Sequence, residues 1–238
     1  MKKVTKYNNK KVIGNCTLYN ADCLHLLPKL EFVNAVVSDP PYSTGYVGGY
    51  NRKGETIAND DTLEVTAQAL KLAQPLCDGN MVVFYSPRIS PIFYKKLNFL
   101  DWFGQIIWNK KAPGMGGEFR YQHENVALFG KNLPIKKAFS LYSYYRDASE
   151  HPHQKPIQIM TQLLNILDAN SILDPFMGSG TTGVACAKLG KRFIGIEIDE
   201  DHFETAVKRI TAAYDQPDLF VENNILQESM ELNDAVKT

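Results

Sequence analysis

"SILDPFMGSGTTGVACAKLGKRFIGIEI", residues 171–198, has the clearest secondary-structure pattern in the chain. A short apolar run at 171–174 predicts a buried strand, and a Gly-rich loop leads from it into residues 181–189, which have the composition of a helix. Gly190 is typical of the residue that ends a helix. The apolar run 192–198 predicts a second strand. Strand, loop, helix and strand in this order indicate a parallel sheet.

The loop at 178–183, GSGTTG, fits the pattern G-x-G-x-x-G of a nucleotide-binding turn. Glu197 ends the next strand, where an acid accepts hydrogen bonds from ribose hydroxyls. Asp174 precedes the loop, and a carboxylate suits a cationic amino-acid tail better than a pyrophosphate. S-adenosylmethionine has both a ribose and such a tail, so these residues favour it over a dinucleotide. The plainer alternative is a tight turn with structural glycines.

"VVSDPPYSTG", residues 36–45, contains a second unusual loop. The apolar run 32–37 predicts a buried strand that leads into Asp39, Pro40, Pro41 and Tyr42. Proline has no backbone N–H, and an ionised aspartate only accepts hydrogen bonds. The segment therefore offers acceptors and a flat ring, a set that suits the exocyclic NH2 group of a nucleobase. The alternative is that the prolines only end the strand and Tyr42 belongs to the core.

Strand and helix patterns alternate along the rest of the chain. This predicts one α/β domain, residues 1–214, with a doubly wound, mainly parallel sheet of the Rossmann-like type, followed by a tail at 215–238. Asp22 is a candidate cap for a short helix, and Pro156 suits the first turn of a helix running to Leu167. Further strands are expected at 12–19, 81–86, 102–108 and 124–130, further helices at 63–73, 89–97 and 200–213, and irregular chain at 43–60 and 131–150.

Composition limits the class of protein. The 238 residues are 44% hydrophobic, enough for one sizeable core. There is no apolar run of about 18 residues and no signal-peptide pattern, so we expect a cytoplasmic protein. The four cysteines are scattered and no metal-ligand spacing is present, so we expect free thiols and no metal. Net charge is zero, yet residues 88–155 hold eleven Lys and Arg against five Asp and Glu, which allows a local basic face.

Three motifs together carry a family resemblance: DPPY at 39–42, HPHQKP at 151–156 and DPFMGSGTT at 174–182. They resemble the DNA amino-methyltransferases. The catalytic motif precedes the cofactor motif, which is similar to the order in the circularly permuted β group of that family. NADC at 20–23 resembles the motif that reads the adenine of the cofactor. The resemblance covers about residues 12–212.

The resemblance implies methyl transfer from S-adenosylmethionine to an exocyclic amine of a base flipped out of double-stranded DNA. Asp39 and the Pro40 carbonyl would accept hydrogen bonds from the amine, and Tyr42 would stack on the base. Lys155 would meet the cofactor carboxylate, unless it is an ordinary solvated lysine. The implied cofactor-binding residues are Asp22, Cys23, Lys155, Asp174, Phe176, Gly178, Ser179, Gly180, Thr181, Thr182 and Glu197, and the implied catalytic residues are Asp39, Pro40, Pro41 and Tyr42.

The target amine stays open on chemistry alone, because adenine N6 and cytosine N4 both suit the segment. In the family, the D-P-P-Y form is more usual for adenine, so adenine is our prediction. A methyltransferase acting on RNA or a protein amide would use a similar loop, often with Asn in place of Asp39. A Rossmann oxidoreductase or a non-enzymatic DNA-binding module would leave one of the motifs unexplained.

Residues 131–150 are the expected target-recognition segment, and their small number predicts a short or relaxed target sequence. Tyrosines there would probe base edges or fill the gap left by the flipped base, unless they pack on the core. A homodimer is expected by family analogy. Candidate DNA contacts are Lys110, Lys111, Arg120, Lys136, Lys137, Tyr142 and Arg146.

The tail contains "QPDLF", residues 216–220. This pentapeptide resembles the segment by which bacterial replication and repair proteins bind the sliding clamp. Gln216 would then bond at the edge of a pocket while Leu219 and Phe220 fill an apolar cleft. The alternative is that the apolar pair folds back onto the sheet.

Overall fold

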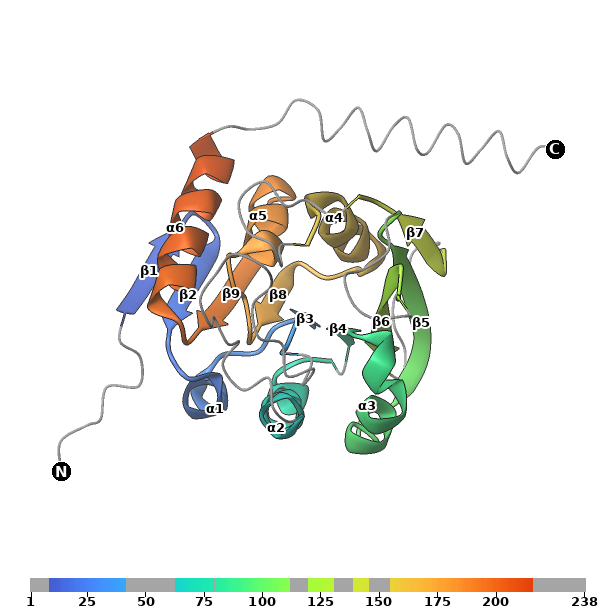
Figure 1. Ribbon diagram of the computed structural model, residues 1–238. Coiled ribbons are helices and arrows are strands. Elements are labelled where there is room, and N and C mark those ends of the chain that lie inside the picture. Colours follow the sequence, from blue (N-terminus) through green and yellow to red (C-terminus); the bar gives the residue numbers. More distant parts are fainter. Residues whose placement is uncertain are drawn as a thin grey trace, which may run out of the picture.

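The computed structural model describes residues 9–41, 63–78, 80–111, 120–130, 139–145 and 155–215. Within these residues nine strands form one sheet in the order β1-β2-β9-β8-β3-β4-β6-β5-β7 (Figure 1). Strands β1 and β6 run opposite to the rest. The strands are β1 (Asn9–Ile13), β2 (Cys16–Asn20), β3 (Ala35–Ser38), β4 (Met81–Tyr85), β5 (Trp102–Asn109), β6 (His123–Phe129), β7 (Leu141–Ser143), β8 (Ser171–Asp174) and β9 (Arg192–Glu197).

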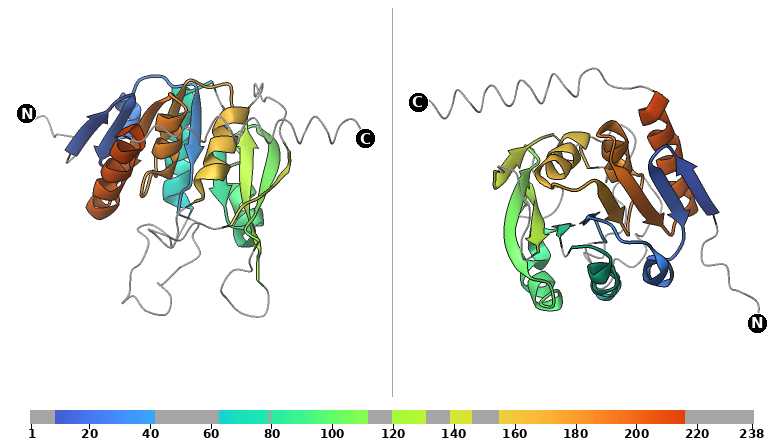
Figure 2. Two further views of the ribbon diagram at one scale, coloured as in Figure 1. Left: turned by 90° about the horizontal axis from the view of Figure 1, so that it is seen from above. Right: turned by 180° about the vertical axis from the view of Figure 1, so that it is seen from behind.

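Helices cover both faces of this sheet. Figures 1 and 2 show α4, α5 and α6 on one face and α1, α2 and α3 on the other. No helix among the described residues is both long and apolar enough to cross a bilayer. The helices are α1 (Cys23–Leu26), α2 (Glu64–Ala73), α3 (Ser90–Lys96), α4 (Ile157–Ile166), α5 (Thr181–Lys188) and α6 (Glu200–Asp215), with short 3-10 turns at Leu27–Lys29, Gln74–Leu76 and Pro87–Ile89.

Two hydrophobic cores lie on the two faces of the sheet. Strand β4 shows the division, because Phe84 packs with Trp108 in the core of the α4–α6 face, while Tyr85 packs with Phe93 in the core of the α1–α3 face. All five residues of β4 are buried, as expected of a strand with helices on both sides. The predicted doubly wound, mainly parallel sheet is confirmed.

The chain changes direction across the sheet between β8 and β3. These strands are parallel neighbours, but β3 continues through α2 to β4, whereas β8 continues through α5 to β9 on the other side. Such a reversal leaves a crevice at the carboxyl ends of the two strands, where ligands of open α/β sheets bind. The side of the sheet at which these parallel strands end is called the carboxyl edge below, and the side at which they begin is called the amino edge. Neither term refers to the outermost strands. Asp174 ends β8 and Asp39 follows β3, so both acids lie at the reversal.

The strand predicted at 12–19 is wrong: the structure has the hairpin β1–β2 there. Its two-residue turn holds Gly14, with a φ of 51°, and Asn15. Gly followed by Asn between apolar runs is a hairpin signal, so the sequence contained the information. A Cβ on Gly14 would lie 2.4 Å from the Tyr214 ring, and the Asn15 N–H donates to the Tyr214 hydroxyl at 2.8 Å. The last turn of α6 is thereby held at the amino edge.

Strand β7 lies in the segment predicted to be irregular. It pairs parallel with the end of β5. The Trp108 indole N–H donates to the Tyr144 carbonyl at 2.9 Å, and the Tyr142 and Tyr144 rings pack partly buried against the core of the α4–α6 face. The short run was missed because its stabilising contacts come from β5 and the core, not from its own pattern.

Candidate active site

Asp174 ends β8 inside the protein, with 1% of its surface exposed. One carboxylate oxygen accepts the Thr182 hydroxyl at 2.8 Å, and the other accepts the Phe176 N–H at 3.1 Å. Burial raises the pKa of Asp174 to about 7, and the two hydrogen bonds offset part of that effect. The carboxyl group is therefore poised to ionise when a cation arrives.

The glycines of the loop after β8 meet different requirements. Gly178 has a φ of 51°, and no atom lies within 4 Å of a Cβ built there. Gly180 has a φ of 83°, and its Cβ would lie 2.8 Å from the Ala206 Cβ of α6. A Cβ on Gly183 would lie 2.8 Å from the Phe193 ring of β9. Two of the three glycines thus allow close packing of helix and sheet behind the loop, which fixes the loop in place.

Glu197 ends β9 and holds the same loop from its other side. Its Oε2 accepts the Gly178 N–H at 2.9 Å, and its Oε1 accepts the Asp199 N–H at 2.8 Å. Burial raises the pKa of Glu197, and these backbone donors lower it in part. The Asn20 side chain at the end of β2 donates to the Glu197 carbonyl at 3.1 Å. The predicted ribose acceptor is thus fixed beside the glycine loop.

The structure places the remaining predicted cofactor residues along the same stretch of the edge. Asp22 caps α1 by accepting the Leu24 N–H at 2.9 Å, as predicted. Burial raises the pKa of the adjacent Cys23 to about 12, so its thiol stays protonated and is no nucleophile. Phe176 packs half-buried against the core of the α1–α3 face.

Arg209 of α6 is a residue that the sequence reasoning missed. Its Nη1 donates to the Ser179 carbonyl at 2.6 Å, to the Ser179 hydroxyl at 3.1 Å and to the Thr181 hydroxyl at 3.3 Å. It fastens the glycine loop to α6. No local pattern could reveal this, because the contact spans about 30 residues and depends on how α6 packs.

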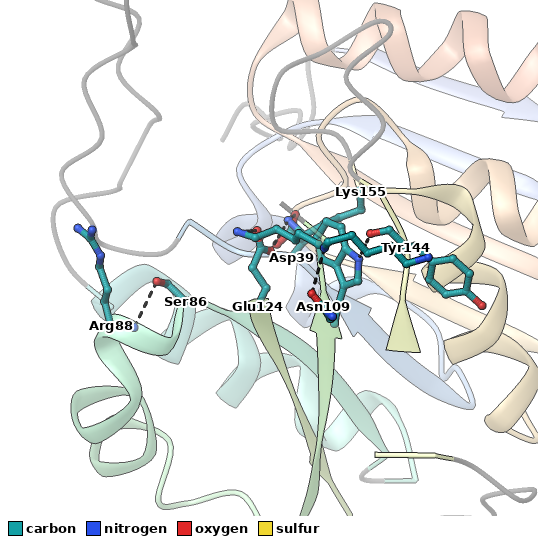
Figure 3. A network of polar contacts seen from close by, with 10 residues as sticks. Asp39, Ser86, Arg88, Asn109, Glu124, Tyr144 and Lys155 are labelled. Carbon is teal, nitrogen blue, oxygen red and sulfur yellow. Dashed lines mark hydrogen bonds and ion pairs between the residues drawn. The ribbon is translucent and has the colours of Figure 1, made fainter. Parts of the chain in front are cut away.

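The predicted catalytic residues follow β3, the parallel neighbour of β8, at the carboxyl edge. Pro40 is buried and Pro41 half-buried. Asp39 Oδ2 lies 2.5 Å from Lys155 Nζ, so Lys155 makes an ion pair with the predicted catalytic acid (Figure 3). Tyr42 lies outside the described residues. The role of Lys155 toward the cofactor stays a prediction, and its described partners are carboxylates of the protein.

Glu124 and Lys110 extend this ion pair, and Glu124 was also missed by the sequence reasoning. Lys155 Nζ lies 3.4 Å from Glu124 Oε2, and Lys110 Nζ lies 3.4 Å from Glu124 Oε1. Burial alone would lower the pKa of Lys155, but the Asp39 and Glu124 carboxylates outweigh it, so the pKa is raised and the ammonium stays charged. The four side chains form an alternating chain of charge, called the buried charge chain below.

The predicted DNA contacts fall into three groups. Lys110 is buried and paired with Glu124, so we no longer propose it as a phosphate contact. Lys111 and Arg120 are exposed, and Lys111 Nζ lies 5.2 Å from the centre of the Tyr145 ring. Tyr142 is half-buried against the core, which supports the packing alternative. Lys136, Lys137 and Arg146 lie outside the described residues, as do Gln216, Leu219 and Phe220.

Comparison with known proteins agrees with this geometry. The family profile described as "DNA methylase" matches residues 132–208. The chain is 30% identical to "Putative methylase YubD" of Escherichia coli K12, covering 80% of this chain and 88% of that protein. It is 27% identical to "Type II methyltransferase M2.DpnII" of Streptococcus pneumoniae, covering 87% of this chain and 92% of the relative.

Solved structures give the same result. The structure titled "crystal structure of M1.HpyAVI-SAM complex" matches with a TM-score of 0.64 and 27% identity over 82% of this chain and 99% of that one. The structure titled "PVUII DNA METHYLTRANSFERASE (CYTOSINE-N4-SPECIFIC)" matches with a TM-score of 0.65 over 88% of this chain and 95% of that one. At 15% identity, the second match shows the shared fold only.

The fold, the fixed glycine loop and the acids beside it define an S-adenosylmethionine-dependent methyltransferase. Asp174 fits the cationic tail of this cofactor, and Glu197 at the end of the next strand fits its ribose. The chain belongs to the DNA methylase family. It is a methyltransferase that uses S-adenosylmethionine and acts on double-stranded DNA.

Proposed function

We propose that the protein methylates the N6 amine of adenine in double-stranded DNA, with Asp39 and Pro40 as the acceptors for that amine. The observation that carries this proposal is the position of Asp39. It follows β3 directly beside β8, whose loop holds the predicted cofactor-binding residues, and its side chain is 24% exposed at the carboxyl edge. An accessible carboxylate next to the cofactor loop supports attack of an amine on the methyl group.

The chemistry follows from the weakness of the nucleophile. The lone pair of an exocyclic amine is delocalised into the base ring. Hydrogen bonds from the NH2 group to the Asp39 carboxylate and the Pro40 carbonyl favour a tetrahedral nitrogen and stabilise the positive charge that develops on it. S-adenosylmethionine, when bound, would supply the methyl group as its S–CH3 bond breaks and would leave as S-adenosylhomocysteine, and the methylated nitrogen would then lose one proton to solvent. Holding amine and methyl donor in line accounts for much of the remaining rate.

The choice of adenine over cytosine rests on the form of the motif. The segment reads D-P-P-Y, the form more usual for adenine in this family. The test is to incubate the protein and labelled cofactor with duplex DNA and, in a parallel reaction, with RNA, then to digest each nucleic acid to nucleosides and separate them. Label in N6-methyladenine is the expected result. Label in N4-methylcytosine alone would replace adenine by cytosine, and label in RNA but not in DNA would overturn the substrate class.

Recognition of the target is proposed to involve the segment 131–150 and the exposed cations Lys111 and Arg120. A short segment supports a short or relaxed target sequence. Methylation-sensitive sequencing of a modified plasmid should therefore return a short consensus, and a long, stringent consensus would contradict this part. Charge removal at Lys111 or Arg120 should weaken binding to all sequences alike and reduce its salt dependence.

Two partners are proposed in addition. Family analogy supports a homodimer, which sedimentation velocity at micromolar concentration would detect as a doubled mass. The pentapeptide QPDLF, residues 216–220, supports docking on a bacterial sliding clamp, which would bring the enzyme to newly copied DNA of the nucleoid.

A labelled peptide of residues 212–224 tests the clamp proposal. It should bind purified clamp with a Kd of roughly 1 μM and lose binding when Leu219 and Phe220 are replaced by Ala. Binding that is absent, or that survives the double substitution, rejects the clamp as a partner.

A further inference from the structure

The buried charge chain joins Asp39, the proposed acceptor for the amine, to the protein interior. Figure 3 shows three of its members, Asp39, Lys155 and Glu124. Lys155 and Glu124 are 7% and 8% exposed, and Lys110 is 8% exposed. The Asp39 side chain, at 24%, is more exposed than the other three side chains. Lys155 Nζ also lies 5.3 Å from the centre of the Phe84 ring, so an aromatic side chain borders the ammonium on that side. Asp39 is thus the member of the chain that a ligand can reach.

This arrangement creates a competition at Asp39. The reaction needs the Asp39 carboxylate to accept hydrogen bonds from the target amine. The same carboxylate is the nearer partner of Lys155, at 2.5 Å against 3.4 Å for Glu124. A buried ammonium with one carboxylate partner would hold that partner tightly, because leaving a buried charge unpaired is costly. Lys155 would then oppose both the approach of the amine and the positive charge that develops on it.

Glu124 offers Lys155 a second partner. Because Glu124 Oε2 faces the same ammonium, Lys155 can strengthen that contact as the amine engages Asp39, and no buried charge is left unpaired. In the substrate-free protein Lys155 lies between the two carboxylates and reduces their repulsion. Lys110, the residue after β5, pairs with the other oxygen of Glu124 and anchors that side chain.

We infer that Glu124 is a positioning residue for the methyl transfer. Its carboxylate becomes the main partner of the Lys155 ammonium, so that the Asp39 carboxylate can accept hydrogen bonds from the target amine. The inference rests on the proposed role of Asp39, and it applies to an adenine or a cytosine amine alike. Glu124 acts through Lys155 and touches no reacting atom. Its effect should therefore depend entirely on the presence of Lys155.

A double-mutant cycle on the full-length chain tests this dependence. The variants are Glu124→Gln, Lys155→Met and the double variant, and the measurement is single-turnover methyl transfer to duplex DNA at saturating S-adenosylmethionine. Glu124→Gln should lower the rate by about tenfold or more, since a hydrogen bond to a charged group is affected. In the Lys155→Met background the same substitution should change the rate by less than about threefold. Equal losses in both backgrounds would mean a merely structural role and overturn the inference.

The variant Lys155→Met should keep at least about a tenth of the wild-type rate. An inactive Lys155→Met variant would overturn the inference, because Lys155 would then be required for the reaction. Glu124→Asp, which keeps the charge, should fall between wild type and Glu124→Gln, and this variant decides the question if Glu124→Gln does not fold. A rate for Glu124→Asp as low as that of Glu124→Gln would also overturn the inference about Glu124.

Two controls separate the possible failures. Calorimetric affinity for S-adenosylmethionine should be unchanged in Glu124→Gln, and Glu31→Gln, a matched substitution at an exposed glutamate, should leave the rate at the wild-type value. Asp39→Ala, which removes the acceptor altogether, is measured in parallel. An active Asp39→Ala variant, or a wild type that methylates no DNA, means that the proposed function fails. An inactive Asp39→Ala variant with an additive cycle means that only this inference fails.

Discussion

The carboxyl edge of the sheet has two halves that use the same residue types in opposite ways. On the half formed by β9 and β8, the described partners of the Asp174 and Glu197 carboxylates are a hydroxyl and backbone N–H groups. On the half formed by β3 and β6, the Asp39 and Glu124 carboxylates face lysines. The first half keeps carboxyl groups that can ionise beside a cationic cofactor. The second half balances its charge inside the protein before a neutral amine arrives. The charge of the expected ligand accounts for the difference.

Asp39→Ala should separate the two halves most strongly. Loss of the acceptor for the amine should lower turnover by about 1,000-fold or more. The affinity for S-adenosylmethionine should change by less than about threefold, because Asp174 and Glu197 remain. Turnover is measured on duplex DNA and affinity by calorimetry. Near-normal turnover of this variant would show that the proposed chemistry is wrong.

Glu197→Ala should give the reverse pattern. Removing both the predicted ribose acceptor and the partner of the Gly178 N–H should raise the Kd for S-adenosylmethionine by about 10- to 100-fold. Turnover at saturating cofactor should stay within about threefold of wild type, because the amine side is intact. Glu200→Ala, at an exposed position in the first turn of α6, is the matched control and should have no effect. A loss of turnover with unchanged affinity for S-adenosylmethionine would contradict the assignment of Glu197 to cofactor binding.

Cofactor affinity should also depend on pH through Asp174. Its pKa is raised to about 7 by burial, so the group is mostly protonated below pH 7 and must lose a proton to face a cation. Affinity should therefore rise by about tenfold per unit between pH 5 and 6.5 and level off near 7. The raised pKa of Glu197 acts in the same direction. Calorimetry in buffers of different ionisation enthalpy should detect proton release on binding, and Asp174→Asn should flatten the dependence. If the affinity of the wild-type protein for S-adenosylmethionine did not change with pH over this range, the proposed ionisation of Asp174 on binding would be wrong.

The last expected effect is on stability and concerns the glycine loop on the cofactor half. Gly180→Ala should lower the free energy of unfolding by about 2–3 kcal/mol, because the new Cβ meets Ala206 and the backbone has a positive φ. Gly178→Ala is the matched control, since φ is positive there but the space is open, and about 1 kcal/mol is expected. Urea denaturation without cofactor measures both. Equal losses would show that packing against α6 is not what requires Gly180.

The fold could be predicted from sequence to the extent that its signals were local. The segment from Ser171 to Glu197 folds as predicted, because strand, glycine loop and helix each have their own pattern. Gly190 ends α5 with a φ of 66°, as a glycine in that position should. The β1–β2 turn has an equally local signal, Gly14 followed by Asn15, which the prediction of one strand at 12–19 did not use. Strand β7 had none, since its contacts come from β5.

The site divides in the same way. The positions of Asp39, Asp174 and Glu197 at one edge follow from the rule that parallel strands bring their carboxyl ends together. The partners of these acids do not follow. Lys155 meets Asp39 across 116 residues, and Glu124 joins them from an antiparallel strand. Lys110 looked like a phosphate contact because its charge is visible in the sequence and its burial is not.

The hydrogen bond between the Asn15 N–H and the Tyr214 hydroxyl fixes the position of the end of α6, the last described part of the chain. It holds the last turn of α6 at the amino edge, opposite the edge that carries Asp39 and Asp174. The tether of any partner bound by the residues after Asp215 would begin there. The gain from such a tether is a higher effective concentration of enzyme on the DNA that the partner encloses. That gain is set by linker length and not by any change in the chemistry, so shortening or lengthening the chain after Asp215 would tune how often the enzyme meets DNA while leaving each turnover the same.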